Sequence, residues 1–575
     1  MKKKTQKKKT RKYIFVVGGV MSGVGKGITA SSIGKILQFA GYEVSAVKID
    51  PYVNVDAGTM NPTEHGETFV LEDGYETDQD MGNYERFLNR SLTRDSYMTT
   101  GSIYQTVINR ERSLGYGGKT VSVVPHVPLA VIDQIQRSAD KEDAEITVVE
   151  IGGTVGEYEN ILFLEAARMM KRQSPQDVAF VLVSYLPVPG TLGEMKTKPT
   201  QQAVRTLQES GIFPDIIVGR SPGIMDDRRR GKIATSSMLH DEDIISAPNL
   251  SSIYDLPEHF VSENLDQKLL RKLSLKSRSN QKGIKNRQAW NRFVNKTKKS
   301  QGEVSIAIVG KYFGTGDFVL SDAYVSVIEA LKFSGAELGV SVKIDWLQAQ
   351  DFEGTEKKKN LKRLHNYGGV IVPGGFGSSG IDGKLAVIEY VRMNKIPFLG
   401  ICLGMQMASV EFARNVLKLK GAHTTEVNPD TDHPVIDILS EQKEKLKQGD
   451  YGGSMRLGSY TANLKPGSLA RKVYKKAAIS ERHRHRYELN TIGNEYQKMF
   501  EEKGFHVSGT SPDGVLTEIV ELDQKLHPFF VGVQFHPELQ ARPLDPHPLF
   551  TGLIKAAKNK KWFLFFILFF FYILV

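Results

Sequence analysis

One short stretch, residues 400–404, constrains the fold of this chain more than any other. It reads Gly-Ile-Cys-Leu-Gly and directly follows the apolar residues 397–399. Two glycines around one potential nucleophile predict a strand that turns sharply into a helix, because only residues without a Cβ allow so tight a backbone and so close an approach of helix and strand. The stretch therefore predicts an α/β architecture that holds Cys402 in the open at the end of a strand.

A thiol nucleophile needs a base, and a candidate lies far downstream. The apolar run 529–533 leads into Gln-Phe-His-Pro-Glu at 534–538. His536 could take the thiol proton, and Glu538 could orient the imidazole and stabilise its charge. A lone cysteine is more often buried and inert. The glycine frame and the His-x-Glu sequence together favour a nucleophile over that alternative.

These motifs resemble those of the class I glutamine amidotransferases. The resemblance implies an α/β domain that hydrolyses glutamine through a triad of Cys402, His536 and Glu538 and hands on ammonia. It also implies an oxyanion hole in residues 372–377, in which backbone N–H groups stabilise the tetrahedral intermediate. The glutamine-binding residues that it implies are Gly375, Leu403, Gly404, Met405, Gln406, Glu426 and Arg486. Among these, Gly375 and Leu403 would supply the oxyanion hole, Glu426 would meet the amino group and Arg486 the α-carboxylate.

Length and composition set the outer limits. A chain of 575 residues is too long for one hydrophobic core, so about two or three domains are expected. The single cysteine excludes a disulfide scaffold and suits a reducing compartment. The N-terminus lacks the apolar segment of a signal peptide. We therefore expect a cytoplasmic globular protein.

The net charge of +11 is unevenly distributed. Residues 1–12 hold eight Lys and Arg and no acidic residue, which leaves +3 for the rest of the chain. We interpret this run as a disordered, solvated tail, with contact to RNA or anionic lipid as the alternative. A second basic stretch, 268–299, holds twelve Lys and Arg and no acid. We expect it to contain a linker between domains, and no specific nucleic-acid binding, because neither stretch carries a recognised module.

The C-terminus is unusual. Residues 562–575 are fourteen consecutive apolar residues that follow the basic sequence 558–561. As a helix they would reach about 21 Å, short of the roughly 30 Å hydrocarbon core of a bilayer. An artefactual or truncated end is the first interpretation, and a weak membrane or partner contact is the second.

A glycine-rich loop near the N-terminus predicts phosphate binding. The buried-strand pattern 13–17 precedes a loop with five glycines at 18–27, and a helical pattern follows to about residue 40. A strand, a glycine loop and a helix N-terminus together present backbone N–H groups to phosphates, and Lys26 would add a positive charge. Gly27 replaces the usual Ser or Thr, so a plain strand–helix turn is the alternative.

Further segments resemble the CTP synthase family over residues 13–557. They are residues 48–56, 58–67, 73–80, 150–157 and 196–201. The resemblance implies ATP-dependent amination of UTP to CTP through a 4-phosphorylated UTP, with ammonia supplied by glutamine hydrolysis. Other P-loop amidotransferases should lack the sequence Lys-Thr-Lys-Pro-Thr-Gln at 196–201. A filament-forming scaffold and a membrane-attached variant are the remaining alternatives.

The same resemblance assigns the nucleotide and metal sites. ATP would contact Gly23, Val24, Gly25, Lys26, Gly27, Ile28 and Asp80. UTP or CTP would contact Ser22, Glu157, Tyr158, Glu159, Lys196, Thr197, Lys198, Pro199, Thr200, Gln201 and Lys232. Mg²⁺ would bind Asp80 and Glu150, with Lys48 at the phosphoryl-transfer centre. Glu150 ends an apolar strand pattern, where ligands bind at the carboxyl edge of a parallel sheet, and carboxylates are the ligands that Mg²⁺ prefers.

The expected organisation follows from these assignments. It comprises a basic tail (1–12), an amidoligase domain (13–275), a basic linker (276–300), an amidotransferase domain (301–557) and an apolar extension (558–575). Alternating strand and helix patterns predict two doubly wound, mostly parallel-sheet domains. The resemblance further implies GTP as an allosteric activator, a homotetramer and the capacity to form filaments. Tyr158 and the long segment 311–324 depart from the commonest family forms in the regions expected for CTP feedback and the GTP response.

Overall fold

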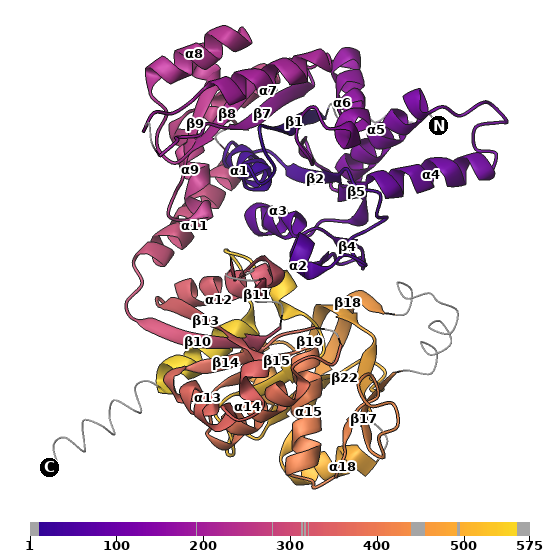
Figure 1. Cartoon of the computed structure of the whole chain (residues 1–575), viewed down its shortest axis with the longest axis vertical. Helices are drawn as coiled ribbons and strands as arrows, with labels where there is room; N and C mark the ends of the chain where they lie inside the picture. Colours follow the sequence, from indigo (N-terminus) through magenta and orange to yellow (C-terminus); the bar gives the residue numbers. More distant parts are fainter. Residues whose placement is uncertain are drawn as a thin grey trace, which may run out of the picture. The chain divides into compact units, whose positions relative to one another are not determined.

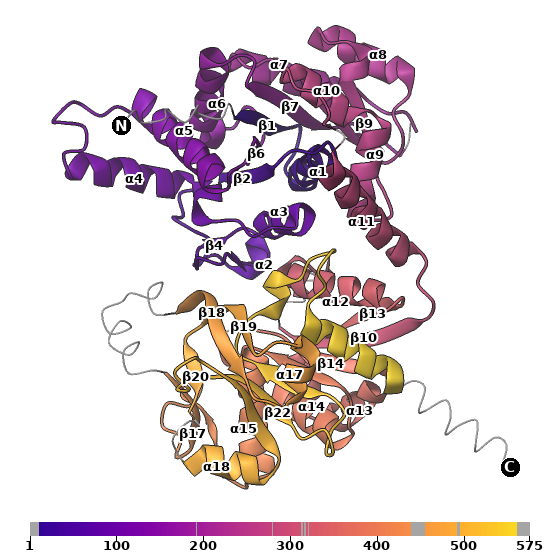
Figure 2. The same cartoon turned by 180° about the vertical axis from the view of Figure 1, so that it is seen from behind.

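The computed structural model describes residues 11–190, 193–278, 280–311, 314–315, 318–319, 321–375, 377–438, 455–490 and 495–560. The apolar run 562–575, most of the basic tail and parts of segment 311–324 lie outside the described residues. The chain divides into two compact units (Figures 1 and 2). Unit 1 runs to Ala57 and resumes over Asp80–Val294, whereas unit 2 comprises Gly58–Gln79 and the chain from Asn295 onward.

Unit 1 is built on a seven-stranded sheet whose neighbouring strands are all parallel, in the order β5-β2-β6-β1-β7-β8-β9. The strands are β1 (Lys12–Gly19), β2 (Val44–Asp50), β5 (Tyr97–Thr99), β6 (Ile146–Ile151), β7 (Val178–Tyr185), β8 (Ile216–Ser221) and β9 (Ile244–Pro248). They are buried along almost their whole length, as expected for a parallel sheet with helices on both faces.

Helices cover both faces of this sheet, which confirms the predicted doubly wound fold (Figure 1). They are α1 (Lys26–Phe39), α3 (Asp80–Leu88), α4 (Thr100–Arg112), α5 (Val123–Lys141), α6 (Ile161–Gln173), α7 (Lys198–Glu209), α8 (Asp227–Ser237), α9 (Leu256–Ser262), α10 (Leu265–Lys272) and α11 (Gln281–Lys298). Helix α1 packs against α3 and α9, and α5 packs against α6. Phe15, Val131 and Phe163 lie in the core between sheet and helices on one face.

Unit 2 contains a nine-stranded sheet in the order β13-β10-β14-β15-β23-β22-β21-β18-β19. Its strands are β10 (Glu303–Gly310), β13 (Ser341–Gln348), β14 (Gly369–Val372), β15 (Phe398–Ile401), β18 (Arg456–Leu464), β19 (Ala478–His485), β21 (Phe505–Thr510), β22 (Thr517–Leu522) and β23 (Phe530–Val533). The strands from β13 to β23 are mutually parallel, and the strands from β22 to β19 continue the sheet in antiparallel pairs.

The helices and smaller sheets of unit 2 surround this large sheet. The helices are α2 (Pro62–His65), α12 (Val325–Glu337), α13 (Lys357–Arg363), α14 (Ile381–Met393), α15 (Leu403–Asn415), α17 (Leu469–Tyr474) and α18 (Glu495–Glu502). The short strands are β3 (Phe69–Val70), β4 (Glu76–Thr77), β11 (Gly314–Thr315), β12 (Phe318–Val319), β16 (His423–Thr424), β17 (Pro434–Ile438) and β20 (Tyr487–Leu489).

The segment Gly58–Gln79 belongs to unit 2, although its position in the sequence places it within the expected amidoligase domain. Arg484 Nε donates to Glu76 Oε1 at 2.7 Å, and Arg482 Nη1 donates to the Val70 carbonyl at 3.0 Å. Ser326 Oγ donates to Glu67 Oε2 at 2.6 Å. Buried arginines need acceptors, and this segment supplies acceptors to both arginines of β19.

The segment expected to be a linker, 276–300, is largely helical. Helix α11 packs against unit 1, which extends as far as Val294. Trp290 is fully buried and donates from its indole N–H to the Tyr254 carbonyl at 3.1 Å, among the rings of Phe87 and Phe293. The aromatic residues give this basic helix an apolar face, which its charge pattern alone did not reveal. Over the part of the chain that the structure describes, no helix is both long and apolar enough to cross a membrane.

Candidate active sites

The predicted elbow is present at the junction of β15 and α15. Cys402 has φ 51° and ψ −103°, a conformation rare for a residue with a side chain, and its N–H donates to the Val533 carbonyl at 2.7 Å. A Cβ on Gly404 would lie 2.0 Å from the Val372 carbonyl oxygen, and a Cβ on Gly400 would lie 2.7 Å from the Gly404 backbone. Both glycines are therefore required by close packing, as their placement in the sequence predicts.

The sheet brings the ends of two distant segments to the same edge. Strand β15 pairs in parallel with β23, with Gly400 opposite Gly532. The carboxyl ends of parallel strands meet at one edge of a sheet. Cys402 and His536 follow these two strands, so the register carries them to the same edge.

His536 lies between an acid and the elbow. Its Nδ1 is 2.7 Å from Glu538 Oε1. Its Nε2 is buried and has no hydrogen-bond partner among the described residues. A Cβ on Gly374 would lie 2.7 Å from His536 Cε1 and 3.6 Å from Cys402 Cβ, so Gly374 lies against both side chains. This arrangement leaves one imidazole nitrogen able to exchange a proton with the thiol.

The electrostatics of this site favour a charged imidazole. Burial lowers the pKa of His536, but the Glu538 carboxylate and the negative charge that Cys402 can carry raise it more, to about 10. An imidazolium next to a cysteine stabilises the thiolate, which is the nucleophilic form. The geometry and charge therefore suit attack of sulfur on a carbonyl carbon.

The residues expected to hold glutamine lie around the loop after Gly375. The Gly377 N–H donates to Glu426 Oε1 at 3.0 Å, and Lys311 Nζ donates to the Gly377 carbonyl at 2.9 Å. Burial raises the pKa of Tyr487. The charge of Glu426 also raises this pKa and the charge of Arg486 lowers it, so both charged side chains interact with the Tyr487 hydroxyl. The expected carboxylate and guanidinium therefore lie in one neighbourhood.

The remaining expected glutamine contacts follow the elbow on α15. The Leu403 and Gly404 backbones form the first turn of the helix. The Met405 side chain is fully buried in the hydrophobic core. The Gln406 side chain is 3% exposed and lies next to Gln534.

A buried lysine that no sequence motif predicts lies in this unit. Lys384 lies on α14 and is 1% exposed. Burial and the charge of Lys311 lower the pKa of Lys384 to about 7, against the raising effect of Glu426 and Cys402. Lys384 interrupts an otherwise apolar face of α14, and no sequence motif includes it. Because its pKa is about 7, this lysine carries a full positive charge only below neutral pH.

The glycine loop in unit 1 connects β1 to α1. Gly25 has φ 91°, in the left-handed region, and a Cβ on Gly27 would lie 2.3 Å from Asp80 Oδ1. Lys26 Nζ donates to the Gly153 carbonyl at 2.7 Å. Burial lowers the pKa of Lys26. The loop therefore places the expected ATP lysine and Asp80 against the start of the same helix.

Three carboxylates surround the ammonium group of Lys48. The register of β2 and β6 places Lys48 opposite Glu150. Lys48 Nζ lies 2.6 Å from Asp80 Oδ2, 3.1 Å from Glu150 Oε1 and 3.3 Å from Asp50 Oδ1. The Tyr84 hydroxyl donates to the other oxygen of Glu150. Asp50 and Tyr84 were missed, and the signal for Asp50 was its position two residues after Lys48, on the same face of the strand.

The two predicted metal ligands have different protonation tendencies. Burial raises the pKa of Glu150, and Lys48 lowers it. Burial also raises the pKa of Asp80, but Lys48 and the hydrogen bond from Asn83 lower it more. Among the described residues no group of three or more His, Cys, Asp or Glu side chains is arranged for a metal. Mg²⁺ in nucleotide sites usually takes one or two carboxylates and phosphate oxygens, so the Asp80 and Glu150 pair fits it.

The residues expected to bind the pyrimidine nucleotide lie at the start of α7 and nearby. Thr200 and Ser184 hydroxyls are 2.9 Å apart, and Gln201 Nε2 donates to Thr197 Oγ1 at 3.3 Å. Lys198 and Pro199 begin α7. Lys196 pairs with Glu194 at 2.7 Å.

The other pyrimidine-site residues are more exposed. Glu157 accepts from the Thr154 N–H at 2.8 Å, and Tyr158 is 91% exposed. Glu159 and Lys232 are also exposed.

Arg220, which no sequence motif predicts, lies beside the glycine loop. Its Nε is 3.4 Å from the Cβ position of Gly25, and its Nη1 donates to the Ala247 carbonyl at 3.1 Å.

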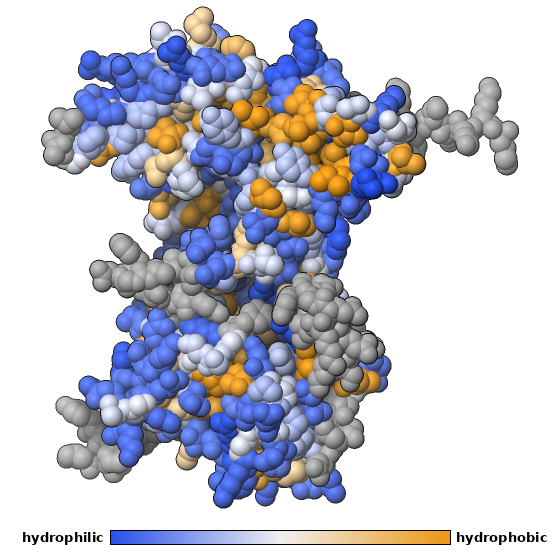
Figure 3. Space-filling view, turned by 45° about the vertical axis from the view of Figure 1, so that its right-hand side comes forward, coloured by the Kyte–Doolittle hydropathy of each residue, from blue (hydrophilic) through white to orange (hydrophobic). Residues whose placement is uncertain are grey.

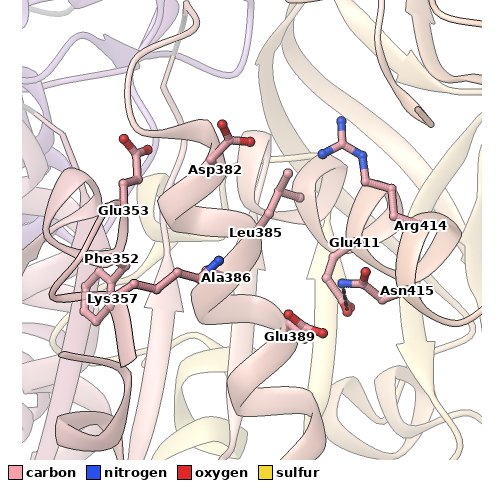
Figure 4. A pocket seen from close by; sticks show the side chains of 11 residues that line it. Phe352, Glu353, Lys357, Asp382, Leu385, Ala386, Glu389, Glu411, Arg414 and Asn415 are labelled. Carbon is pink, nitrogen blue, oxygen red and sulfur yellow. Dashed lines mark hydrogen bonds between the residues drawn. The ribbon is translucent and has the colours of Figure 1, made fainter. Parts of the chain in front are cut away.

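A pocket of about 430 Å³ lies elsewhere in unit 2, between α14, α15 and residues 352–357 (Figure 4). Its charged lining includes Glu389, Asp382 and Arg414, and Glu411 in its wall is held by Arg392 at 2.7 Å. None of the expected site residues lines it.

The fold and the two sites define a class of protein, an α/β nucleotide-binding unit joined to a class I glutamine amidotransferase unit. The family model described as CTP synthase N-terminus matches residues 12–275, and the model described as glutamine amidotransferase class-I matches residues 319–556. CTP synthases of Picosynechococcus sp. and Thermococcus kodakarensis are 46% and 47% identical to this chain, over 96% of it and 96% and 99% of their own lengths. The chain belongs to the CTP synthase family.

Among solved structures, the glutaminase domain of Trypanosoma brucei CTPS with bound acivicin is 35% identical to this chain. It covers 44% of this chain and 94% of its own length, with a TM-score of 0.41. As a family member, the enzyme is a glutamine-hydrolysing ligase that forms CTP, with ATP, UTP and glutamine as substrates and Mg²⁺ alongside ATP.

Proposed function

We propose that the chemistry is divided between two sites, one in each unit. In unit 1, the Lys48 site transfers a phosphoryl group from ATP to O4 of UTP. In unit 2, Cys402, His536 and Glu538 release ammonia from glutamine. The observation that carries this proposal is the presence of two separate buried ionic groups, each at the carboxyl ends of parallel strands in the sheet of its own unit.

In the reactive form of the glutamine site, the proton of Cys402 Sγ resides on His536 Nε2, so a thiolate faces an imidazolium. The thiolate attacks the amide carbon, and the backbone N–H groups of Gly375 and Leu403 receive the developing oxyanion. The protonated imidazole gives its proton to the leaving nitrogen, so ammonia departs and a thioester remains. Water then adds with His536 as base, and glutamate leaves. Glu538 orients the imidazole and stabilises its charge throughout.

The UTP reaction needs activation of a poor leaving group. Transfer of the γ-phosphoryl group to O4 makes that oxygen a phosphate ester, ammonia adds at C4, and phosphate leaves to give CTP. Lys48 stabilises charge on the transferring group, and residues 23–28 hold the triphosphate on backbone N–H groups and Lys26. Asp80 and Glu150 would hold Mg²⁺, which neutralises phosphate charge when bound. Residues 196–201, with Ser22 and Lys232, would hold the pyrimidine nucleotide, and residues 157–159 would respond to CTP.

We further propose that the chain assembles as a homotetramer, with filaments as a higher assembly and GTP as an activator of glutamine hydrolysis. Hydrophobic side chains gather on the surface of unit 1 (Figure 3). Exposed apolar residues of α4, α5 and their connection are Ile108, Leu114, Val123, Val124 and Leu129. Exposed apolar patches mark protein interaction sites, so this surface supports self-association.

The test of the division of labour is CTP formation by Cys402→Ala with two nitrogen sources. We expect glutamine-dependent formation to fall at least about a thousandfold, because the nucleophile is lost. Ammonium-dependent formation should stay within about twofold of wild type. Absorbance follows CTP from UTP and Mg-ATP in both assays.

Ser409→Ala provides the matched control, because Ser409 is fully buried on α15 and donates only to the Met405 carbonyl at 3.1 Å. It should retain both activities. If a well-folded Cys402→Ala variant lost the ammonium reaction too, the two chemistries would not be separate and the proposal would be wrong.

A further inference from the structure

Gln534 directly follows strand β23, which leads to His536, and its side chain reaches the nucleophile Cys402. Its side chain is fully buried. Its backbone N–H donates to the Glu518 carbonyl at 2.9 Å, which fixes the residue against β22. Its side-chain Nε2 lies 3.8 Å from Cys402 Sγ, where an amide N–H can donate to sulfur.

A second glutamine determines which end of this amide faces the sulfur. Gln406 Nε2 donates to Gln534 Oε1 at 3.3 Å and to the Tyr487 carbonyl at 3.0 Å. Because the oxygen of Gln534 accepts from Gln406, its NH₂ group is the end that points to Sγ. The orientation is thus imposed by a chain of hydrogen bonds that ends on the protein backbone.

Besides His536, two polar groups near Sγ favour different forms of the thiol. The Arg484 carbonyl oxygen lies 3.9 Å from Sγ and can only accept, so it suits the protonated thiol. The amide of Gln534 can donate, so it suits the thiolate. A hydrogen bond to the charged form of an acid favours that form. When the proton has passed to His536, the Arg484 carbonyl can no longer accept from the sulfur, and Gln534 can donate to the thiolate beside the imidazolium.

We propose that Gln534 is a thiolate-stabilising residue of glutamine hydrolysis: its side-chain N–H donates to Cys402 Sγ and steadies the sulfur for attack. This inference rests on the proposed role of Cys402 as nucleophile. It also changes the role expected of Gln406. Both N–H groups of that side chain are engaged inside the protein, so within the described chain its Oε1 is the atom left for substrate glutamine.

The pH dependence of thiol alkylation tests this proposal directly. Cys402 is the only cysteine, so mass spectrometry of iodoacetamide labelling reports on this thiol alone. Gln534→Met keeps the length of the side chain and removes the donor, and Gln534→Glu replaces the donor with an acceptor. We expect the midpoint of the rate–pH curve to rise by about 0.5–1 pH unit in Gln534→Met and further in Gln534→Glu.

Glutaminase kinetics provide a second readout. We expect kcat at neutral pH to fall about tenfold or more in Gln534→Met, with the KM for glutamine within about twofold. Ammonium-dependent CTP formation, which is assigned to unit 1, reports that unit 1 is intact, and thermal unfolding reports that unit 2 of the variants is folded. Ser409→Ala, another buried polar residue of α15, should leave the alkylation midpoint unchanged.

Failure of this inference and failure of the proposed function would give different experimental results. An alkylation midpoint in both Gln534 variants equal to that of wild type overturns the inference, whatever happens to kcat. Glutamine-dependent activity in Cys402→Ala would instead overturn the proposed function, and the alkylation curve does not depend on that outcome.

Discussion

Lys48 lies within 3.3 Å of three carboxylates, and Lys26 is a second ammonium group that interacts with Asp80 and Glu150. Lys48 is 5% exposed and Glu150 is 2% exposed. Removing one partner of a buried ionic group leaves the others uncompensated, so such a cluster is costly unless a reaction uses it. The cluster is consistent with the proposed function, in which a divalent cation and phosphate groups would share it.

We expect Lys48→Met to abolish CTP formation from both nitrogen sources, by at least a hundredfold, because charge on the transferring phosphoryl group loses its stabilising cation. Glutaminase turnover, measured as glutamate release, should persist. Lys171→Met is the control: Lys171 is half-exposed, belongs to the same unit and makes a 3.5 Å contact to Asp215. CTP formation near the wild-type rate in Lys48→Met would exclude Lys48 from the reaction centre.

A second residue-scale prediction concerns stability and pH. Burial raises the pKa of Glu488 from 4.5 to about 8, although Arg456 lowers it. The fold therefore favours the protonated form, and the stability from this proton is lost as the pH rises from about 4.5 to about 8. Glu488→Gln keeps an acceptor for Arg456 and removes the titration. The variant should gain at least about 1 kcal/mol over wild type at pH 8.5, or about 2–4 °C in Tm, and much less at pH 5.

Thermal unfolding followed at both pH values checks this expectation. Glu356→Gln, which changes an exposed carboxylate paired with Lys359, should show no such difference. An equal Tm difference between Glu488→Gln and wild type at pH 5 and pH 8.5 would mean that Glu488 does not titrate in this range.

Site residues that belong to a contiguous motif could be predicted from the sequence. Residues that reach the site only because distant strands and helices pack together could not. Cys402 and His536 each lie in a local pattern with a chemical meaning. Gln534 and Lys384 acquire their surroundings only when β23 and α14 pack beside the elbow. A glutamine two residues before a histidine, or a lysine within a helix, carries no such information by itself.

At the scale of elements, the strand–helix elbow depends on backbone contact. Gly404→Ala should abolish glutaminase activity, because the added methyl group would meet the Val372 carbonyl oxygen at 2.0 Å and push α15 away from β14. Overpacking of this kind typically costs about 1–3 kcal/mol. Glutamate release and thermal unfolding measure the two effects, and ammonium-dependent CTP formation should remain.

Gly223→Ala is the matched substitution, because a Cβ at Gly223 has no neighbour within 4 Å. It should change neither glutamate release nor Tm appreciably. Full glutaminase activity in Gly404→Ala would show that the elbow tolerates displacement of its helix.

The elements themselves could largely be predicted, because parallel strands and amphipathic helices follow from apolar patterns. Two segments could not. The sequence of Gly58–Gln79 carries no sign that its acceptors serve Arg482 and Arg484, which lie some 400 residues later. The basic charge of α11 hid the buried face formed by Trp290 and Phe293.

At the scale of the whole molecule, the apolar surface of unit 1 predicts assembly. Leu114 is 73% exposed, and we expect Leu114→Asp to shift the enzyme from the proposed tetramer to smaller species in sedimentation velocity, because a charge would have to be desolvated in the contact. Phe213→Asp, which changes a residue that is 67% exposed and lies outside α4 and α5, should sediment like wild type. Equal sedimentation of all three proteins would locate self-association elsewhere.

The assignment of Gly58–Gln79 to unit 2 has a consequence for protein engineering. The polypeptide passes between the units three times, after Ala57, after Gln79 and after Val294, so the coding sequences of the two units are interleaved along the gene. Cutting the gene once, near residue 295, would leave Glu76 in the first product and its partner Arg484 in the second. A stand-alone amidotransferase should therefore be made by grafting residues 58–79 onto it, or by supplying them as a separate peptide.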